Sequence, residues 1–164
     1  MFRCIVVLAA FASALIIDQA SKALMINVLE QGDSIWLAPF ANLRLVYNRG
    51  ISFGMLADLI GAYPVAASLA KMVIVAGLLA WAFLVITAWE SAALSLIAGG
   101  AAGNIADRLR NGEVTDFIDL HAGGWHWPTF NVADIWIVSG SLFIAVLCIF
   151  GTPGGAVATE RPRP

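Results

Sequence analysis

The chain has 164 residues, of which 60% are hydrophobic and only 12% are charged, and its mean hydropathy is +0.86. Soluble domains are about 45–50% apolar and about 25% charged, so this composition excludes a soluble globular fold and requires lipid to cover part of the surface. A formal net charge of −2 and a pI near 5.5 argue against nucleic acid as a partner. The length corresponds to one domain.

Four apolar segments approach the roughly 20 residues that a helix needs to cross about 30 Å of hydrocarbon. We expect membrane-spanning helices at about 4–24, 65–88, 91–107 and 134–150. The first segment follows Arg3 and also fits a cleavable secretory signal. That alternative leaves Asp18 and Lys22 without a purpose, and the remaining chain would still span the membrane.

Residues 33–63, between the first two spans, differ in character from the rest. Asn42–Asn48 alternates roughly between apolar and polar residues and predicts a strand, and a turn signal follows at Asn48-Arg-Gly50. Met55–Tyr63 predicts a short interfacial helix. We therefore expect an all-α integral membrane protein with a small extramembrane β-sheet and this short helix. The tail at 151–164 is predicted to be disordered.

Polar residues cluster at one end of the predicted spans. Four spans put both termini on one side of the membrane and the two long connections on the other side. The polar residues that then converge on that second side are Asp18, Lys22, Asn48, Arg49, Asn104, Asp107, Arg108 and Asp134. The sequence thus predicts one polar site at one membrane surface.

The orientation of the chain is a separate question. Basic residues near the span ends number five on the polar side and three on the other, and these are Lys22, Arg44, Arg49, Arg108 and Arg110 against Arg3, Arg161 and Arg163. By the positive-inside rule alone, the polar side would be cytoplasmic. The count includes arginines that belong to the predicted site, which weakens it as a signal of topology.

Carboxylates are the groups that could carry chemistry here. Asp116 lies in an apolar frame, and Asp134 opens the last predicted span. Two neighbouring carboxylates cannot both ionise easily, so one keeps a proton while the other acts as a base, as in aspartic proteases. Asp134 could instead be only the N-cap of its helix.

Other readings of the polar residues stay open. Asp116 and Asp119, three residues apart, could hold a metal, and Asp18 could simply pair with Lys22 at i, i+4. His121 and His126 flank a Gly-Gly-Trp turn and are predicted to be interfacial loop residues.

Four motifs together resemble the lipoprotein signal peptidases, also called signal peptidase II. They are Asp18-Gln-Ala-Ser-Lys22, Asn48-Arg-Gly-Ile-Ser-Phe-Gly54, residues 99–108 (GGAAGNIADR) with residues 112–118 (GEVTDFI), and Phe130-Asn-Val-Ala-Asp134. The resemblance covers about residues 4 to 150. Departures are modest: Ala102 stands where a larger aliphatic residue is usual, Ile135 stands where a small residue is common, and the tail holds only two arginines.

The resemblance implies an aspartic endopeptidase that cleaves diacylglyceryl-modified prolipoproteins before the lipidated cysteine. It implies a catalytic pair at Asp116 and Asp134, without a cofactor or metal. The supporting or substrate-binding positions that it implies are Asp18, Lys22, Asn48, Gly50, Asn104, Asp107, Arg108 and Asn131. The sheet would be a cradle over the substrate.

The family also implies a place and partners. The site would lie near the outer surface of the bacterial cytoplasmic membrane, with both termini cytoplasmic, which is opposite to the charge count. Prolipoproteins, membrane lipids and globomycin-type inhibitors would be the partners. Two other functions are weighed against this one: a proton-coupled transporter, which usually has midplane acids and internal repeats, and a non-enzymatic membrane scaffold.

Overall fold

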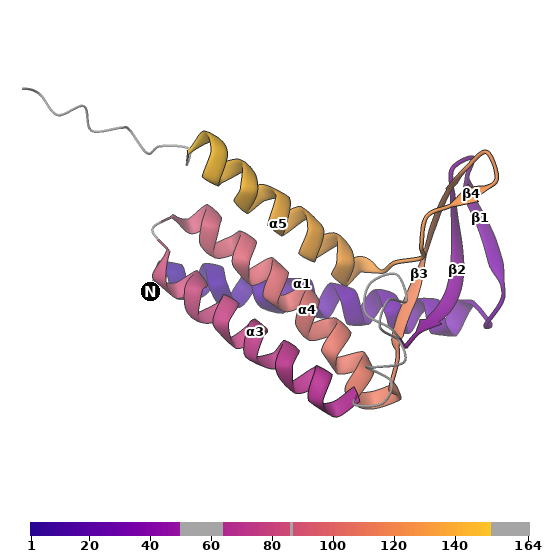
Figure 1. Cartoon of the computed structure of the whole chain (residues 1–164), viewed down its shortest axis with the longest axis horizontal. Helices are drawn as coiled ribbons and strands as arrows, with labels where there is room; N and C mark the ends of the chain where they lie inside the picture. Colours follow the sequence, from indigo (N-terminus) through magenta and orange to yellow (C-terminus); the bar gives the residue numbers. More distant parts are fainter. Residues whose placement is uncertain (50–63, 86, 152–164) are drawn as a thin grey trace, which may run out of the picture.

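The computed structural model describes residues 1–49, 64–85 and 87–151, without the side chains of 64–67. In this part of the chain, α1 (Phe2–Val28), α3 (Pro64–Leu84), α4 (Ala88–Asn111) and α5 (Val132–Phe150) form a bundle. A small sheet stands at one end of this bundle (Figure 1). Gly50, the interfacial helix expected at Met55–Tyr63 and the tail from 152 onward lie outside the described residues.

Helix α4 is the centre of the bundle and packs against α1, α3 and α5. Its glycines permit this because they let backbones approach closely. A Cβ on Gly99 would lie 2.5 Å from the Phe11 carbonyl oxygen of α1, and a Cβ on Gly100 would lie 2.6 Å from the Ala133 carbonyl oxygen of α5. A third glycine, Gly103, faces the side chain of Asp18. The small residues of α4 therefore bring α1 and α5 to its two sides.

Two of these helices could cross a membrane by length and composition: α1, with a mean hydropathy of 2.0, and α5, with 2.3. Helix α3 is also apolar over Ser68–Leu84, the part of it whose side chains the structure describes. Helix α4 carries ten buried residues along its length and lies between its neighbours. The four helices expected from the sequence are thus present, and they differ in how much apolar surface they expose.

The helix boundaries differ from expectation at several points. Helix α1 continues to Val28, and α4 runs from Ala88 to Asn111, longer at both ends than predicted. The spans predicted at 65–88 and 91–107 place a short connection at about residues 89–91, and this placement is wrong. Thr87 is the N-cap, and its side chain and that of Glu90 form a reciprocal capping box, so the helix begins directly after Thr87.

The sheet contains strands from two distant parts of the chain. Its antiparallel order is β1 (Ser34–Ala38), β2 (Ala41–Asn48), β3 (Val114–Ala122) and β4 (Trp125–His126). The strand predicted at Asn42–Asn48 is confirmed by β2. The sheet expected at residues 33–63 extends beyond that segment, because β3 and β4 belong to the connection between α4 and α5. This connection folds back along β2 and brings Asp116 opposite Val46.

Candidate active site

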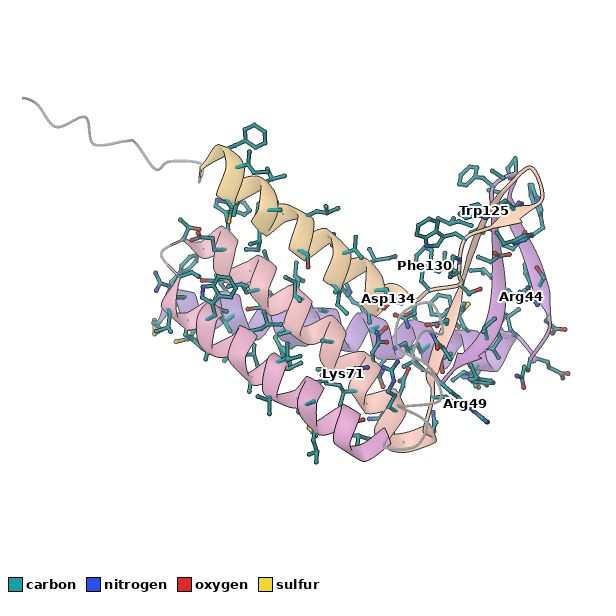
Figure 2. All side chains as sticks on the ribbon, viewed as in Figure 1. Arg44, Arg49, Lys71, Trp125, Phe130 and Asp134 are labelled. Carbon is teal, nitrogen blue, oxygen red and sulfur yellow. The ribbon has the colours of Figure 1, made fainter. Side chains whose placement is uncertain are left out.

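Asp116 and Asp134 come together where the sheet meets the bundle. Asp116 lies on β3, and Asp134 lies in the first turn of α5. Both line a cavity of about 690 Å³. Much of the remaining wall is apolar and includes Ile135, Val138 and Leu142 of α5. Figure 2 shows Asp134 and Phe130 close to each other at this junction.

Three asparagine side chains hold the two carboxylates. Asn48 Nδ2 donates to Asp116 Oδ2 at 3.0 Å, and Asn131 Nδ2 donates to Asp116 Oδ1 at 2.6 Å. Asn104 Nδ2 donates to Asp134 Oδ1 at 3.0 Å. The same Asn131 amide also donates to Asn104 Oδ1 at 3.1 Å, so one network joins both carboxylates.

Asp134 is not the N-cap of α5, so that alternative is wrong. Asn131 is the N-cap and Asp134 is the third helical residue, and the two form a capping box. Asn131 N–H donates to Asp134 Oδ2 at 3.2 Å, and Asp134 N–H donates to Asn131 Oδ1 at 3.1 Å. One oxygen of Asp134 therefore completes the helix terminus, while the other accepts a hydrogen bond from Asn104.

The environment of Asp116 favours its protonated form. Its residue surface is 2% exposed, and burial is the main reason that its pKa is raised to about 6. The charge of Asp134 acts in the same direction. Hydrogen bonds from Asn48 and Asn131, and the charge of Lys22, offset part of this rise in pKa. Asp116 consequently keeps its proton up to a higher pH than an ordinary carboxyl group does.

A second group of charges lies behind the two carboxylates. Lys22 Nζ lies 2.9 Å from Asp18 Oδ2 and 2.9 Å from Asp107 Oδ2, and it donates to Asn104 Oδ1 at 2.8 Å. The i, i+4 pair of Asp18 and Lys22 is thus confirmed, but it is only part of a larger network. Gln19 Nε2 also donates to Asp107 Oδ1 at 3.0 Å.

The convergence of polar residues is only partly as expected. Asp18, Lys22, Asn48, Asn104, Asp107 and Asp134 belong to this network, and Arg108 lines the cavity. Arg49 does not join them, because it pairs with Glu113 at 3.0 Å and its side chain is 82% exposed. Figure 2 shows Arg49 on the outside of the molecule. Gly50 lies outside the described residues.

Asp119 belongs to a different cluster from Asp116. Residues three apart in a strand point to opposite faces, so the pair cannot act as it would on a helix. Asp119 accepts from Asn42 Nδ2 at 3.3 Å and lies 2.8 Å from His126 Nδ1. Burial alone would raise its pKa, but the hydrogen bonds from His126 and Asn42 and the charges of the two histidines together lower it.

The two histidines lie in strands, so their assignment to an interfacial loop is wrong. His121 belongs to β3, His126 belongs to β4, and their ring centroids are 5.1 Å apart. Among the described residues, no group of three or more His, Cys, Asp or Glu side chains could hold a metal ion.

Some residues of the site were not singled out from the sequence. Lys71, Trp127 and Phe130 line the cavity, and Gln19 joins the charges behind it. Lys71 gives the clearest sequence signal, because it is the only charge in an apolar segment, and such charges usually mark a functional region. Gln19 has no such signal of its own.

Comparison with known proteins gives one family. The family model described as "Signal peptidase (SPase) II" matches residues 10–150. A lipoprotein signal peptidase of Methylobacterium sp. (strain 4-46) is 38% identical over 161 residues, which cover 92% of this chain and 93% of the relative. One from Anaplasma phagocytophilum (strain HZ) is 40% identical over 132 residues, covering 79% of this chain and 83% of the relative.

The fold comparison agrees. A solved bacterial membrane enzyme structure superposes with a TM-score of 0.76 at 26% identity, covering 96% of this chain and 93% of that one. A second gives a TM-score of 0.74 at 28% identity, covering 89% of this chain and 94% of that one. The resemblance that the sequence motifs carry is therefore confirmed, and the chain belongs to the signal peptidase II family.

Proposed function

We propose that this protein is an aspartic endopeptidase that removes signal peptides from diacylglyceryl-modified prolipoproteins by cleaving before the lipidated cysteine. Family membership supports the general activity, which is proteolytic removal of signal peptides from lipoproteins. The observation that carries the mechanism is the pairing of Asp116 and Asp134 across one cavity, joined by asparagine amides.

The reaction needs one proton on the pair. The ionised carboxylate removes a proton from a water molecule, and the resulting nucleophile attacks the scissile carbonyl carbon. The protonated carboxyl donates a hydrogen bond to the carbonyl oxygen and so stabilises the charge that develops there. The proton is then transferred to the leaving amine, and the peptide bond breaks. Because the proton is shared, the base and acid roles belong to the pair.

The cavity suits a peptide that carries lipid. Its apolar wall on α5 can contact an acyl chain or an apolar side chain of the signal peptide. The remainder of the acyl tails would lie in the bilayer. Asn48 and Arg108 line the cavity beside the carboxylates and are able to donate hydrogen bonds to the substrate backbone. The sheet extends from this edge and would hold the peptide as a cradle.

In the bilayer, we place all four helices as spans of one membrane domain. The carboxylate end would lie at the outer surface of the bacterial cytoplasmic membrane, and both termini would be cytoplasmic. Membrane lipids would surround the bundle, and globomycin-type inhibitors are expected to occupy the cavity. The proposed chemistry uses only side chains and water, and it requires no metal or cofactor.

The test uses purified protein in detergent with a diacylglyceryl-modified prolipoprotein. Wild type should cleave before the lipidated cysteine with and without EDTA, whereas folded Asp116→Asn and Asp134→Asn should lose at least about 1000-fold in rate, as expected when a catalytic group is removed. Asp119→Asn is the matched control, since it removes a buried carboxylate from the same strand. It should keep its rate within a few fold.

Two results would contradict the mechanism. Cleavage by a folded Asp116→Asn or Asp134→Asn protein would show that the pair is not required. Loss of cleavage in EDTA would indicate that a metal takes part.

A further inference from the structure

Lys22 is a buried cation whose hydrogen-bonding capacity is fully used. Its side chain is 3% exposed, and an ammonium group has three N–H donors. The three donors have three acceptors at 2.8–2.9 Å, which are Asp18 Oδ2, Asp107 Oδ2 and Asn104 Oδ1. Lys22 does not belong to the cavity lining, so it has no direct route to a substrate.

The two carboxylates bound to Lys22 each hold the backbone next to a catalytic candidate. Asp107 Oδ2 accepts the N–H of Thr115 at 3.2 Å, and Thr115 directly precedes Asp116. Asp18 Oδ1 accepts the N–H of Ala133 at 2.9 Å, and Ala133 directly precedes Asp134. One ammonium thus braces two carboxylates that anchor the start of α5 and the first half of β3.

The third acceptor is the side-chain oxygen of Asn104, and this contact orients the Asn104 amide. Lys22 has only donors, so the oxygen of Asn104 must face it, and the Nδ2 group of Asn104 must face Asp134. The same oxygen accepts from Asn131 Nδ2, which also donates to Asp116 Oδ1. The Lys22 ammonium therefore orients the Asn104 amide directly, whereas the Asn131 amide is also oriented by the Asp134 N–H, which its oxygen accepts.

We propose that Lys22 is a positioning residue for the proteolytic step, which holds the backbone next to both aspartates and orients the Asn104 amide that binds Asp134. This inference rests on the proposed function. It assigns Lys22 a role beyond pairing with Asp18. Lys22 acts through Asp107 on Thr115, through Asp18 on Ala133, and directly on Asn104. Its positive charge also lowers the pKa of Asp116, against the effect of burial.

The first variant is Lys22→Met, which keeps the side-chain length and removes all three donors. A small misplacement of catalytic groups costs roughly 100-fold in rate, so we expect kcat to fall by about that factor. KM should change less than about threefold, because Lys22 lies outside the cavity lining. The ascending limb of the pH–kcat profile should move to higher pH, because Asp116 loses a nearby positive charge.

The matched control is Val7→Ala, which weakens the same helix at a fully buried position of the hydrophobic core, away from the site. Its thermal stability should fall, while the pH limb stays in place. Two outcomes would show that Lys22 has a merely structural role. One is a kcat of Lys22→Met within about threefold of wild type. The other is a loss of kcat no larger than that of Val7→Ala, with the ascending limb of the pH–kcat profile at its wild-type position.

The Lys22→Arg variant separates the effect of the hydrogen-bond geometry of Lys22 from the effect of its positive charge. It also tests the proposal if Lys22→Met does not fold. A planar guanidinium keeps the charge but cannot direct three donors as an ammonium does. We expect the pH limb to stay at the wild-type position while kcat remains reduced by at least about tenfold. A wild-type kcat in Lys22→Arg would overturn the proposal.

A readout without catalysis keeps this inference distinct from the proposed function. If wild type fails to cleave any prolipoprotein, the proposed function fails. NMR titration of isotope-labelled Asp116 then still tests the positioning role of Lys22. The Lys22→Met substitution should raise the pKa of Asp116 and shift the backbone amide signals of Thr115 and Ala133. Unchanged signals would overturn the positioning role.

Discussion

At the scale of single residues, the central feature is a carboxyl group kept in an unfavourable environment. Asp116 is buried beside Asp134, and burial raises its pKa to about 6. The unfolded chain has a pKa near 3.8 at this residue. The folded protein therefore binds a proton more tightly than the unfolded chain, which links stability to pH.

This linkage gives a prediction for Asp116→Asn. The stability that the proton contributes is fully present below pH about 3.8 and is lost as pH rises through about 6. The loss is of order 3 kcal/mol, since each pKa unit corresponds to about 1.4 kcal/mol. Unfolding in detergent, followed from pH 4 to pH 7, should show wild type losing stability relative to Asp116→Asn. Parallel curves for the two proteins would contradict the raised pKa.

At the scale of elements, close packing around α4 connects the helices to the site. Gly100 contacts the start of α5 at the backbone of Ala133, one residue before Asp134. A side chain at this position must push α5 away from α4, because the atom it meets is a backbone oxygen. The position of Asp134 relative to Asp116 thus depends on Gly100, a residue with no side chain that could take part in the reaction.

We predict that Gly100→Ala lowers both stability and cleavage. Overpacking of this kind costs about 1–3 kcal/mol, and displacement of Asp134 should reduce kcat by roughly tenfold or more. Gly77→Ala is the control, because Gly77 lies in α3 and a Cβ there meets nothing within 4 Å. Alanine in a helix is favoured over glycine by roughly 0.5–1 kcal/mol, so this variant should be as stable as wild type or more stable. Thermal unfolding and cleavage rates measure both effects. Equal behaviour of the two variants would show that close approach at Gly100 is unimportant.

At the scale of the whole molecule, the two ends of the bundle carry different parts of the chain. The junction with the sheet carries Asp116 and Asp134, while the first residues of α1 and the last residues of α5 lie at the far end (Figure 1). The exposed turn at Gln31 lies between α1 and β1, on the side of the sheet. The proposed topology puts this turn outside the cytoplasmic membrane and the connection between α3 and α4 inside.

Single cysteines test that orientation. In a background with Cys4→Ser and Cys148→Ser, a membrane-impermeant maleimide should label Gln31→Cys in spheroplasts. The matched position is Trp89→Cys, which is exposed near the start of α4 and should be labelled only after the membrane is opened. The reverse pattern would restore the orientation that the charge count favours.

The sequence by itself determined the class of protein, the polar end and the strand at β2, because these features follow from hydropathy and from periodicity within one segment. The motifs also indicated Asp116 and Asp134 as a pair. Only the tertiary structure decided that β3 completes the sheet, that Asn131 rather than Asp134 caps α5, and that Lys22 reaches Asn104, 82 residues away. Local patterns report whether a side chain is buried, but the identity of its partner depends on how distant elements pack.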